Sequence, residues 1–153
     1  MQVERCLNAT GMAPNLLELE LTESVFLQNT EKVLESLADL RRLGVRLSID
    51  DFGTGYSSLS YLSHFHVHTL KIDGSFVEGI GTHPTNTAIV TAILALARAT
   101  SLEVVAEGVE TVDQYRFLKD QGCPLGQGYF FSKPVCPSEI PDILARGFDP
   151  GGT

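Results

Sequence analysis

The stretch Thr30–Asp50 reads TEKVLESLADLRRLGVRLSID and contains a helix signal followed at once by a strand signal. Its first part repeats apolar residues at the spacing of an amphipathic helix, and Gly44 follows as a stop signal. Its last part, Val45–Asp50, is typical of a β-strand. Such a helix-to-strand unit is the building block of an α/β fold. The apolar face of the helix consists of Val33, Leu34, Leu37, Leu40 and Leu43.

The same alternation of strand and helix runs along the whole chain, which predicts one parallel sheet with right-handed crossovers. Two architectures fit: an open doubly wound sheet, or part of a (β/α)8 barrel. A complete barrel needs about 250 residues, so this chain has room for about five of the eight units. It is therefore interpreted as a partial TIM-type α/β barrel entered midway. The predicted strands are Leu16–Leu21, Val45–Asp50, Thr69–Asp73, Glu103–Ala106 and Leu125–Phe131, and the predicted helices are Thr30–Leu43, Ser57–Phe65, Asn86–Ala99, Val112–Asp120 and Ser138–Ala145.

Composition limits the partners and the compartment. The 153 residues carry 19 acidic and 11 basic side chains, a net charge of −8. Such a chain lacks the basic face that phosphate backbones require, so no nucleic-acid polymer is expected as a partner. The longest apolar run, Ala92–Ala97 with its flanks, is far shorter than the roughly 20 residues that span a bilayer, so no membrane contact is expected. Three cysteines without a CxxC pair favour a reducing, cytoplasmic location, although a parent protein could still be membrane-anchored.

Polar side chains stand at the end of every predicted strand. In a parallel α/β fold these carboxyl ends form the edge where sites are built. Oxygen ligands from several strands suit Mg²⁺ or Mn²⁺, and two such ions about 3.5–4 Å apart suit phosphodiester hydrolysis. A lone strand-end acid is usually a solvated loop residue, and a turn or cap explains the Asp50–Asp51 pair alone more often than a metal does. Five strand ends in register nevertheless favour a metal site. The strand-end residues are Glu20, Asp50, Asp51, Lys71, Asp73, Glu107 and Gln127.

Five sequence blocks at these strand ends are distinctive in content and in order. They read ELTES at 20–24, DDFGTGYSS at 50–58, LKID at 70–73, VAEGVE at 105–110 and QGYFFSKP at 127–134. Together they resemble the EAL domain, the bacterial cyclic-di-GMP phosphodiesterase, over about Leu7–Leu144. The resemblance implies a variant TIM barrel. It also implies that residues 1–148 are the C-terminal part of an EAL domain, and we expect residues 149–153 to be a flexible tail.

The resemblance implies hydrolysis of cyclic-di-GMP to linear pGpG with two bound Mg²⁺ or Mn²⁺ ions. Glu20 matches a metal-binding glutamate of that family. Asp50 matches the acid that bridges both ions, and Asp51 matches a ligand of the second ion. Glu107 matches a further carboxylate of the second metal site, and we expect it to take part in catalysis. Lys71 matches the catalytic lysine that contacts the hydrolytic water.

The resemblance also implies contacts beyond the metals. Gln127 matches a site glutamine, and we expect Gln127 and Asp73 to contact the substrate. Glu23 matches a residue that anchors a loop coupling the metal site to a homodimer interface. That loop corresponds here to Phe52, Gly53, Thr54 and Gly55.

The chain also departs from the family pattern. The Glu-Ala-Leu motif and a metal-binding asparagine are absent, which leaves Glu20 and Asp50 as ligands of the first metal. We therefore expect weak binding at that metal site and an inactive isolated chain. We also expect an open half-barrel whose interior shows Leu, Ile and Val to water and which self-associates. The alternative function is a non-catalytic module that binds cyclic-di-GMP or a protein partner.

Three histidines alternate just before the third predicted strand, at 64, 66 and 68. On an extended segment they would share one face, and imidazole binds transition metals readily. We favour the simpler interpretation, an exposed connector at the bottom of the barrel, away from the strand ends that carry the acids.

Overall fold

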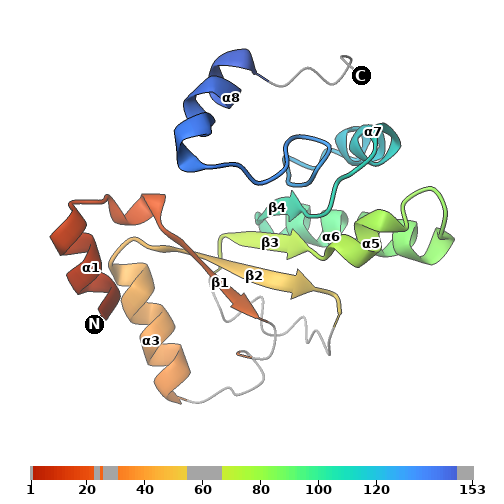
Figure 1. The fold of residues 1–153 in the computed structure, drawn as a ribbon. Helices are drawn as coiled ribbons and strands as arrows, with labels where there is room; N and C mark the ends of the chain where they lie inside the picture. The colour runs from red at the N-terminus through yellow and green to blue at the C-terminus, as the bar shows by residue number, and fades with distance from the viewer. Residues whose placement is uncertain (1, 23–24, 26–30, 55–66, 148–153) are drawn as a thin grey trace.

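The computed structural model of the chain describes residues 2–22, 25, 31–54 and 67–147. Its centre is one sheet of five strands whose order follows the sequence, β1-β2-β3-β4-β5 (Figure 1). Each strand pairs in parallel with the next one along the chain, so the predicted parallel α/β sheet is confirmed. The strands are β1 (Glu18–Thr22), β2 (Arg46–Phe52), β3 (Thr69–Ile72), β4 (Glu103–Ala106) and β5 (Leu125–Gly126).

The long helices begin and end close to their predicted bounds because their caps are local. The Thr111 hydroxyl accepts a hydrogen bond from the Gln114 backbone N–H, and the Gln114 side chain accepts one from the Thr111 N–H. The pattern does not predict α5, and the predicted helix over Ser57–Phe65 lies outside the described residues. The α-helices are α1 (Gln2–Thr10), α3 (Glu31–Arg42), α5 (Gly74–Glu78), α6 (Pro84–Thr100), α7 (Val112–Asp120) and α8 (Ile140–Arg146), with 3₁₀ turns at η1 (Pro14–Leu16) and η2 (Pro137–Glu139).

One face of the sheet is apolar and carries the core. Alternate residues of a strand point to opposite faces, and register partners on neighbouring strands share a face. The Ile49–Leu70 pair of β2 and β3 is on the apolar face, against which α3 and α6 pack. The core includes Leu47, Ile49, Leu70, Ile72, Val104 and Ala106 from the strands, and Leu37, Leu40, Val90, Ile93, Leu94, Ala97 and Leu118 from the helices.

The opposite face of the sheet is mostly polar, and here one expectation is met only in part. An open barrel interior was expected to show Leu, Ile and Val to water. Most of these side chains lie on the helix-covered face instead, but Leu125 of β5, which pairs with Val105, is 48% exposed on the inner side. The register pairs Glu20 with Ser48, and Ser48 with Thr69, so the other face carries charged and hydroxyl groups. Its members on β1 to β4 are Glu18, Glu20, Arg46, Ser48, Asp50, Thr69, Lys71, Glu103 and Val105.

The fifth strand is much shorter than the predicted Leu125–Phe131. Strand pairing ends at Gly126, and the chain then turns back at Gly128. The backbone there lies so close to Val109 that a Cβ on Gly128 would be 2.1 Å from the Val109 carbonyl oxygen. The returning segment brings the Phe131 ring over Gly126 and into contact with Tyr115. Phe130 and Phe131, which suggest a long strand, therefore pack against Tyr115 of α7.

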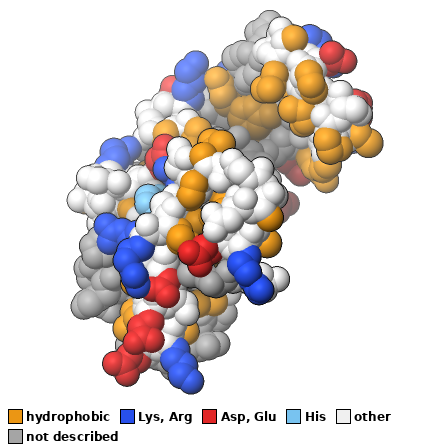
Figure 2. Space-filling view, turned by 90° about the vertical axis from the view of Figure 1, so that its left-hand side faces the viewer, with side chains coloured by type: hydrophobic (Ala, Val, Ile, Leu, Met, Phe, Trp, Pro, Cys, Tyr) orange, Lys and Arg blue, Asp and Glu red, His pale blue; other side chains and the backbone are white. Residues whose placement is uncertain are grey.

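Exposed hydrophobic side chains gather near the C-terminal end. In Figure 2 they cluster on the lobe formed by α8 and the segment before it. Leu144 is 75% exposed and Tyr129 is 59% exposed, the latter in the turn after β5. No helix among the described residues has the length and apolar character needed to cross a bilayer.

Candidate functional site

Lys71 of β3 is the centre of the candidate site. Its side chain is only 10% exposed, and its ammonium contacts three carboxylates that come from three other strand ends. Nζ lies 2.6 Å from Glu20 Oε1 of β1, 2.9 Å from Asp50 Oδ1 of β2 and 2.8 Å from Glu107 Oε1, just after β4. The predicted convergence of these four residues is therefore seen in the structure.

The three acids determine the charge state of the lysine. Burial alone disfavours the ammonium and lowers the pKa of Lys71. Hydrogen bonds to Glu107, Glu20 and Asp50 outweigh that penalty and raise its pKa above the usual lysine range. Lys71 is consequently a fixed positive charge with its donors aimed at the acids, and it is unsuited to accept a proton at neutral pH.

A local irregularity of β2 brings two adjacent aspartates to the same edge. The β2–β3 register shifts between Ile49 and Phe52, so Asp50 and Asp51 together lie opposite Lys71. Asp51 takes a left-handed backbone conformation with φ 53°, which is uncommon for a residue other than glycine. Partial burial raises the pKa of Asp51, and the nearby Asp50 charge raises it further. A bound cation would relieve this crowding of like charges.

The donor set of the site fits a hard divalent cation. Asp50, Asp51 and Glu107 each offer a carboxylate oxygen, and these oxygens lie within 4.8 Å of one another. Such all-oxygen sets suit Mg²⁺, Mn²⁺ or Ca²⁺. Glu20 is not in this group of three. It is 54% exposed, and its carboxylate contacts Lys71 instead.

The two predicted substrate contacts lie beside this edge. Asp73 caps α5, because its Oδ1 accepts a hydrogen bond from the Ser75 backbone N–H at 3.0 Å. This capping role of Asp73 was missed, although Asp followed by Gly-Ser is a recognisable cap signal. Gln127 follows β5 and is exposed, and its backbone joins Ala106 and Val109 through hydrogen bonds. Their contact with substrate stays a prediction.

The loop expected to couple the site to a partner is described in part. Phe52 is buried in the core and Gly53 has φ 99°. Thr54 closes a turn by donating from Oγ1 to the Asp51 carbonyl at 2.9 Å. Glu23 and Gly55 lie outside the described residues.

The histidine segment is described only at its end. His64 and His66 lie outside the described residues. His68 immediately precedes β3, at the end of the strand away from the acids. Its Nδ1 accepts a hydrogen bond from the Leu47 backbone N–H at 3.1 Å. This hydrogen bond to the backbone of β2 gives His68 a structural role.

The family of the chain follows from comparison with known proteins. The family model described as "EAL domain" matches residues 1–134. The chain belongs to the EAL domain family. Its EAL blocks thus carry the Lys71 cluster described above.

Named relatives and solved structures of the family agree with this assignment. The chain is 45% identical over 149 residues to the cyclic di-GMP phosphodiesterase NbdA of Pseudomonas aeruginosa, covering 97% of this chain and 19% of NbdA. It matches the structure titled "PaMucR Phosphodiesterase, c-di-GMP complex" with a TM-score of 0.86 and 41% identity, over 90% of this chain and 56% of that one. A manganese and cyclic-di-GMP complex of Klebsiella pneumoniae BlrP1 matches with a TM-score of 0.81 and 36% identity, over 88% of this chain and 34% of that one.

These matches also bear on the fold and on the extent of the chain. The similarity to solved EAL domains confirms the predicted partial TIM-type barrel. The chain spans about a fifth of the length of the curated relatives it matches.

Proposed function

We propose that this EAL segment carries the catalytic edge of a cyclic-di-GMP phosphodiesterase. The observation that supports it best is the Lys71 cluster, in which one buried ammonium contacts acids from three strand ends. This cluster gathers acids from three strands at the edge where α/β folds place their chemistry. The name of NbdA and the cyclic-di-GMP complexes of PaMucR and BlrP1 support the choice of substrate.

Asp50, Asp51 and Glu107 are the residues that would hold divalent cations, with Glu20 completing the set. Mg²⁺ or Mn²⁺ suits these ligands, and the manganese complex of BlrP1 supports this choice of metal. When bound, such ions neutralise phosphate charge and make water a better nucleophile. Asp50 has a special place in this arrangement, because it both touches Lys71 and belongs to the metal-binding group.

Lys71 acts in the proposed reaction as a fixed hydrogen-bond donor. Its raised pKa keeps the ammonium charged, so it can orient the attacking water and stabilise charge that develops on the phosphate. The water oxygen bonds to phosphorus, and the phosphorus–oxygen bond to one ribose 3′ oxygen breaks. The attacking water gives up one proton and the leaving 3′ oxygen takes one up, so protons balance and the ring opens to linear pGpG.

The proposal includes contacts around this centre. Asp73 and Gln127 would bind the substrate beside the metals. Glu23 and the loop of Phe52, Gly53, Thr54 and Gly55 would link the site to a homodimer interface. We place the protein in the cytoplasm, where the cyclic dinucleotide acts as a second messenger.

A chimera tests the proposal without depending on the isolated chain. Residues 1–134 replace the matching segment of NbdA, and pGpG is followed by chromatography after addition of cyclic-di-GMP and Mn²⁺. We expect turnover within about tenfold of NbdA, and its loss in the Lys71→Ala chimera with binding largely intact, since the lysine acts mainly on the transition state. A folded chimera that binds the dinucleotide but never opens it would contradict the proposal and favour the non-catalytic alternative.

A further inference from the structure

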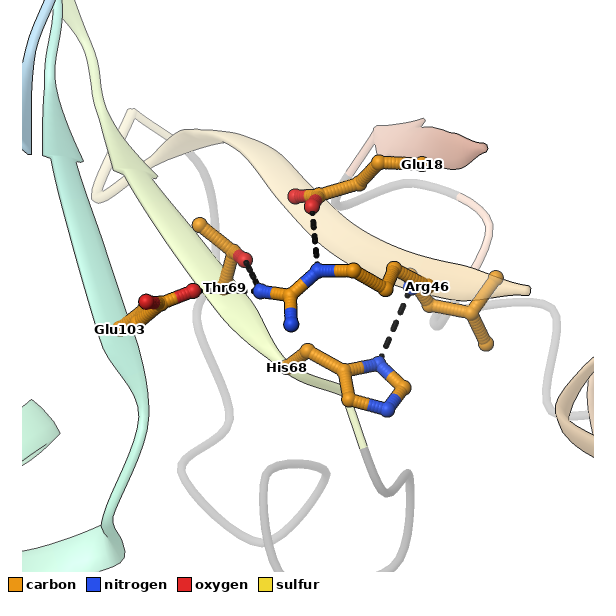
Figure 3. Close-up of polar contacts among 6 residues, drawn as sticks. Glu18, Arg46, His68, Thr69 and Glu103 are labelled. Atoms are coloured by element: carbon orange, nitrogen blue, oxygen red, sulfur yellow. Dashed lines mark hydrogen bonds and ion pairs between the residues drawn. The ribbon is translucent and has the colours of Figure 1, made fainter. Parts of the chain in front are cut away.

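A second, partly exposed cluster lies on the polar face of the sheet, at the end opposite the Lys71 site. Arg46 opens β2, and its guanidinium reaches side chains on three other strands (Figure 3). Nε donates to Glu18 Oε2 of β1 at 2.9 Å, and Nη2 donates to Thr69 Oγ1 of β3 at 3.2 Å. Nη2 also pairs with the Glu103 carboxylate of β4. One side chain thereby connects the four strands whose other ends carry Lys71 and its acids.

Each of these strands contributes one residue to each cluster, on the same face. Residues two or four positions apart in a strand share a face and keep a fixed separation along it. A slide of one strand against its neighbours therefore displaces its members of both clusters together. The pairs are Glu18 with Glu20 on β1, Arg46 with Asp50 on β2, Thr69 with Lys71 on β3, and Glu103 with Glu107 at the end of β4.

The site end of β2 particularly needs such an anchor. The ladder between β2 and β3 is regular at Ser48 and Ile49, but its register shifts before Phe52. Regular backbone pairing therefore fixes Asp50 against β1, through Thr22, but not directly against Lys71 of β3. A restraint must come from the regular part of β2, and Arg46 is the side chain there that bonds to both neighbouring strands.

We propose that Arg46 is a positioning residue of the Lys71 site. By bonding to Glu18, Thr69 and Glu103 it fixes the register of β1 to β4, so that their far ends bring the acids within reach of Lys71. This inference rests on the proposed function for its metal-binding consequence. Arginine suits the role because its planar fork presents several donors in fixed directions, which a lysine ammonium on a flexible stem cannot do.

For the loss of Arg46, the proposal predicts a change in Mn²⁺ affinity opposite in direction to the change that electrostatics alone would cause. Arg46 is about 13 Å from Asp50 along the strand, from about 3.3 Å per residue. Removing its positive charge should by Coulomb's law strengthen cation binding, by less than about threefold after screening. Loss of positioning should instead weaken Mn²⁺ binding about tenfold, comparable to the effect of removing an outer partner of a metal ligand.

The experiment measures Mn²⁺ binding to the full 153-residue chain through the electron paramagnetic resonance signal of the free ion. The variants are Arg46→Met, Arg46→Lys and the matched control Arg42→Met. Arg42 is also an arginine in an ion pair, with Asp39 on α3, but it is 78% exposed and away from the sheet. We expect about tenfold weaker binding for Arg46→Met, a smaller loss for Arg46→Lys despite its unchanged charge, and no loss for Arg42→Met. Affinity unchanged or raised in Arg46→Met would overturn the proposal.

A metal-free measurement separates this inference from the proposed function. A buried ammonium held by three carboxylates exchanges protons slowly, so Lys71 should give a resolved proton–nitrogen cross-peak in ¹⁵N NMR spectra. We expect that peak to disappear in Arg46→Met, to weaken in Arg46→Lys and to persist in Arg42→Met. Should the unmodified chain bind no Mn²⁺, the metal part of the proposed function fails, and the Lys71 cross-peak alone tests positioning. Its persistence at full intensity in a folded Arg46→Met chain would refute positioning by Arg46.

Discussion

Lys71 is a buried cation that has more acidic neighbours than it can neutralise. It contacts Glu20, Asp50 and Glu107, of which the last two also belong to the metal-binding group. The ammonium and a divalent ion would therefore compete for the same carboxylates. A lysine in this place keeps the acids together without metal, at the expense of metal affinity.

Replacing Lys71 by methionine should separate these two effects. We expect the metal-free chain to lose about 3 kcal/mol of unfolding free energy, at the lower end for a broken buried ion pair because Glu20 is half exposed. We expect Mn²⁺ affinity to rise, because the competing cation is gone. Urea unfolding with and without Mn²⁺ measures both quantities. Lys32→Met, at an exposed position of α3, is the matched control. Weaker Mn²⁺ binding in Lys71→Met would contradict competition.

Cysteine reactivity offers an independent check on burial beside β5. Burial raises the pKa of Cys123, whose thiol donates to the Leu125 carbonyl, whereas Cys6 and Cys136 are exposed. Thiolate is the reactive form, so at pH 8 iodoacetamide should label Cys123 at least about tenfold more slowly than the other two. The difference should shrink as pH rises and vanish in urea. Peptide mass spectrometry measures the rates, and equal native rates would show that Cys123 is accessible.

The residue-level prediction succeeds where topology alone fixes the outcome. Parallel strands end at one edge of the sheet, so the sequence alone predicts that Glu20, Asp50 and Glu107 lie close together. The orientation of Asp51 cannot be predicted this way, because alternation would turn it toward the other face. The register shift in β2 and its left-handed backbone bring it to the site instead.

At the scale of elements, the loops after β3 and β4 approach each other beside the site. Gly108 has φ 67°, and a Cβ built there would lie 3.1 Å from the Gly74 Cα. Because Gly108 directly follows Glu107, this close approach helps to place that carboxylate.

Gly108→Ala should therefore disturb both stability and the site. The left-handed backbone alone costs roughly 1–2 kcal/mol for an alanine, and the contact with Gly74 adds to it. Gly81→Ala is the control, since Gly81 has φ 79° and open space around it. We expect Gly108→Ala to lose more unfolding free energy than Gly81→Ala, and only Gly108→Ala to bind Mn²⁺ more weakly. Equal losses in urea unfolding would mean that the contact with Gly74 is unimportant.

The elements themselves can be predicted where their signals are local. The bounds of α7 follow from the Thr111 cap, and the end of α3 from Gly44. The length of β5 cannot be predicted from such a signal, because an aromatic run suits a strand and a packed turn equally well. Only the approach of Gly128 to Val109, a contact distant in sequence, decides for the turn.

At the scale of the whole molecule, the sheet has two edge strands, β1 and β5. The polar face between them explains how a partial barrel tolerates water on its inner side. Apolar exposure is concentrated on α8, before β1 and on edge strand β5, with Leu144 75%, Leu16 74% and Leu125 48% exposed. Unpaired edges and exposed apolar side chains both favour association with another chain.

We therefore expect the isolated 153-residue chain to self-associate at micromolar concentration. Leu144→Glu should reduce the association, and the control Leu34→Glu on α3, where the native leucine is 40% exposed, should not. Size-exclusion chromatography with light scattering measures the mass. A monomer with a sharp cooperative melt would show that the edges and α8 are covered in solution.

The central claim is that acids from separate strand ends form a divalent-cation site beside Lys71. Anomalous diffraction at the manganese edge, from crystals grown with Mn²⁺ and cyclic-di-GMP, tests it most directly. We predict an anomalous peak within about 2.5 Å of carboxylate oxygens of Asp50, Asp51 and Glu107, with the phosphate of the dinucleotide beside it. Well-ordered crystals with no peak among these carboxylates at saturating Mn²⁺ would contradict the account.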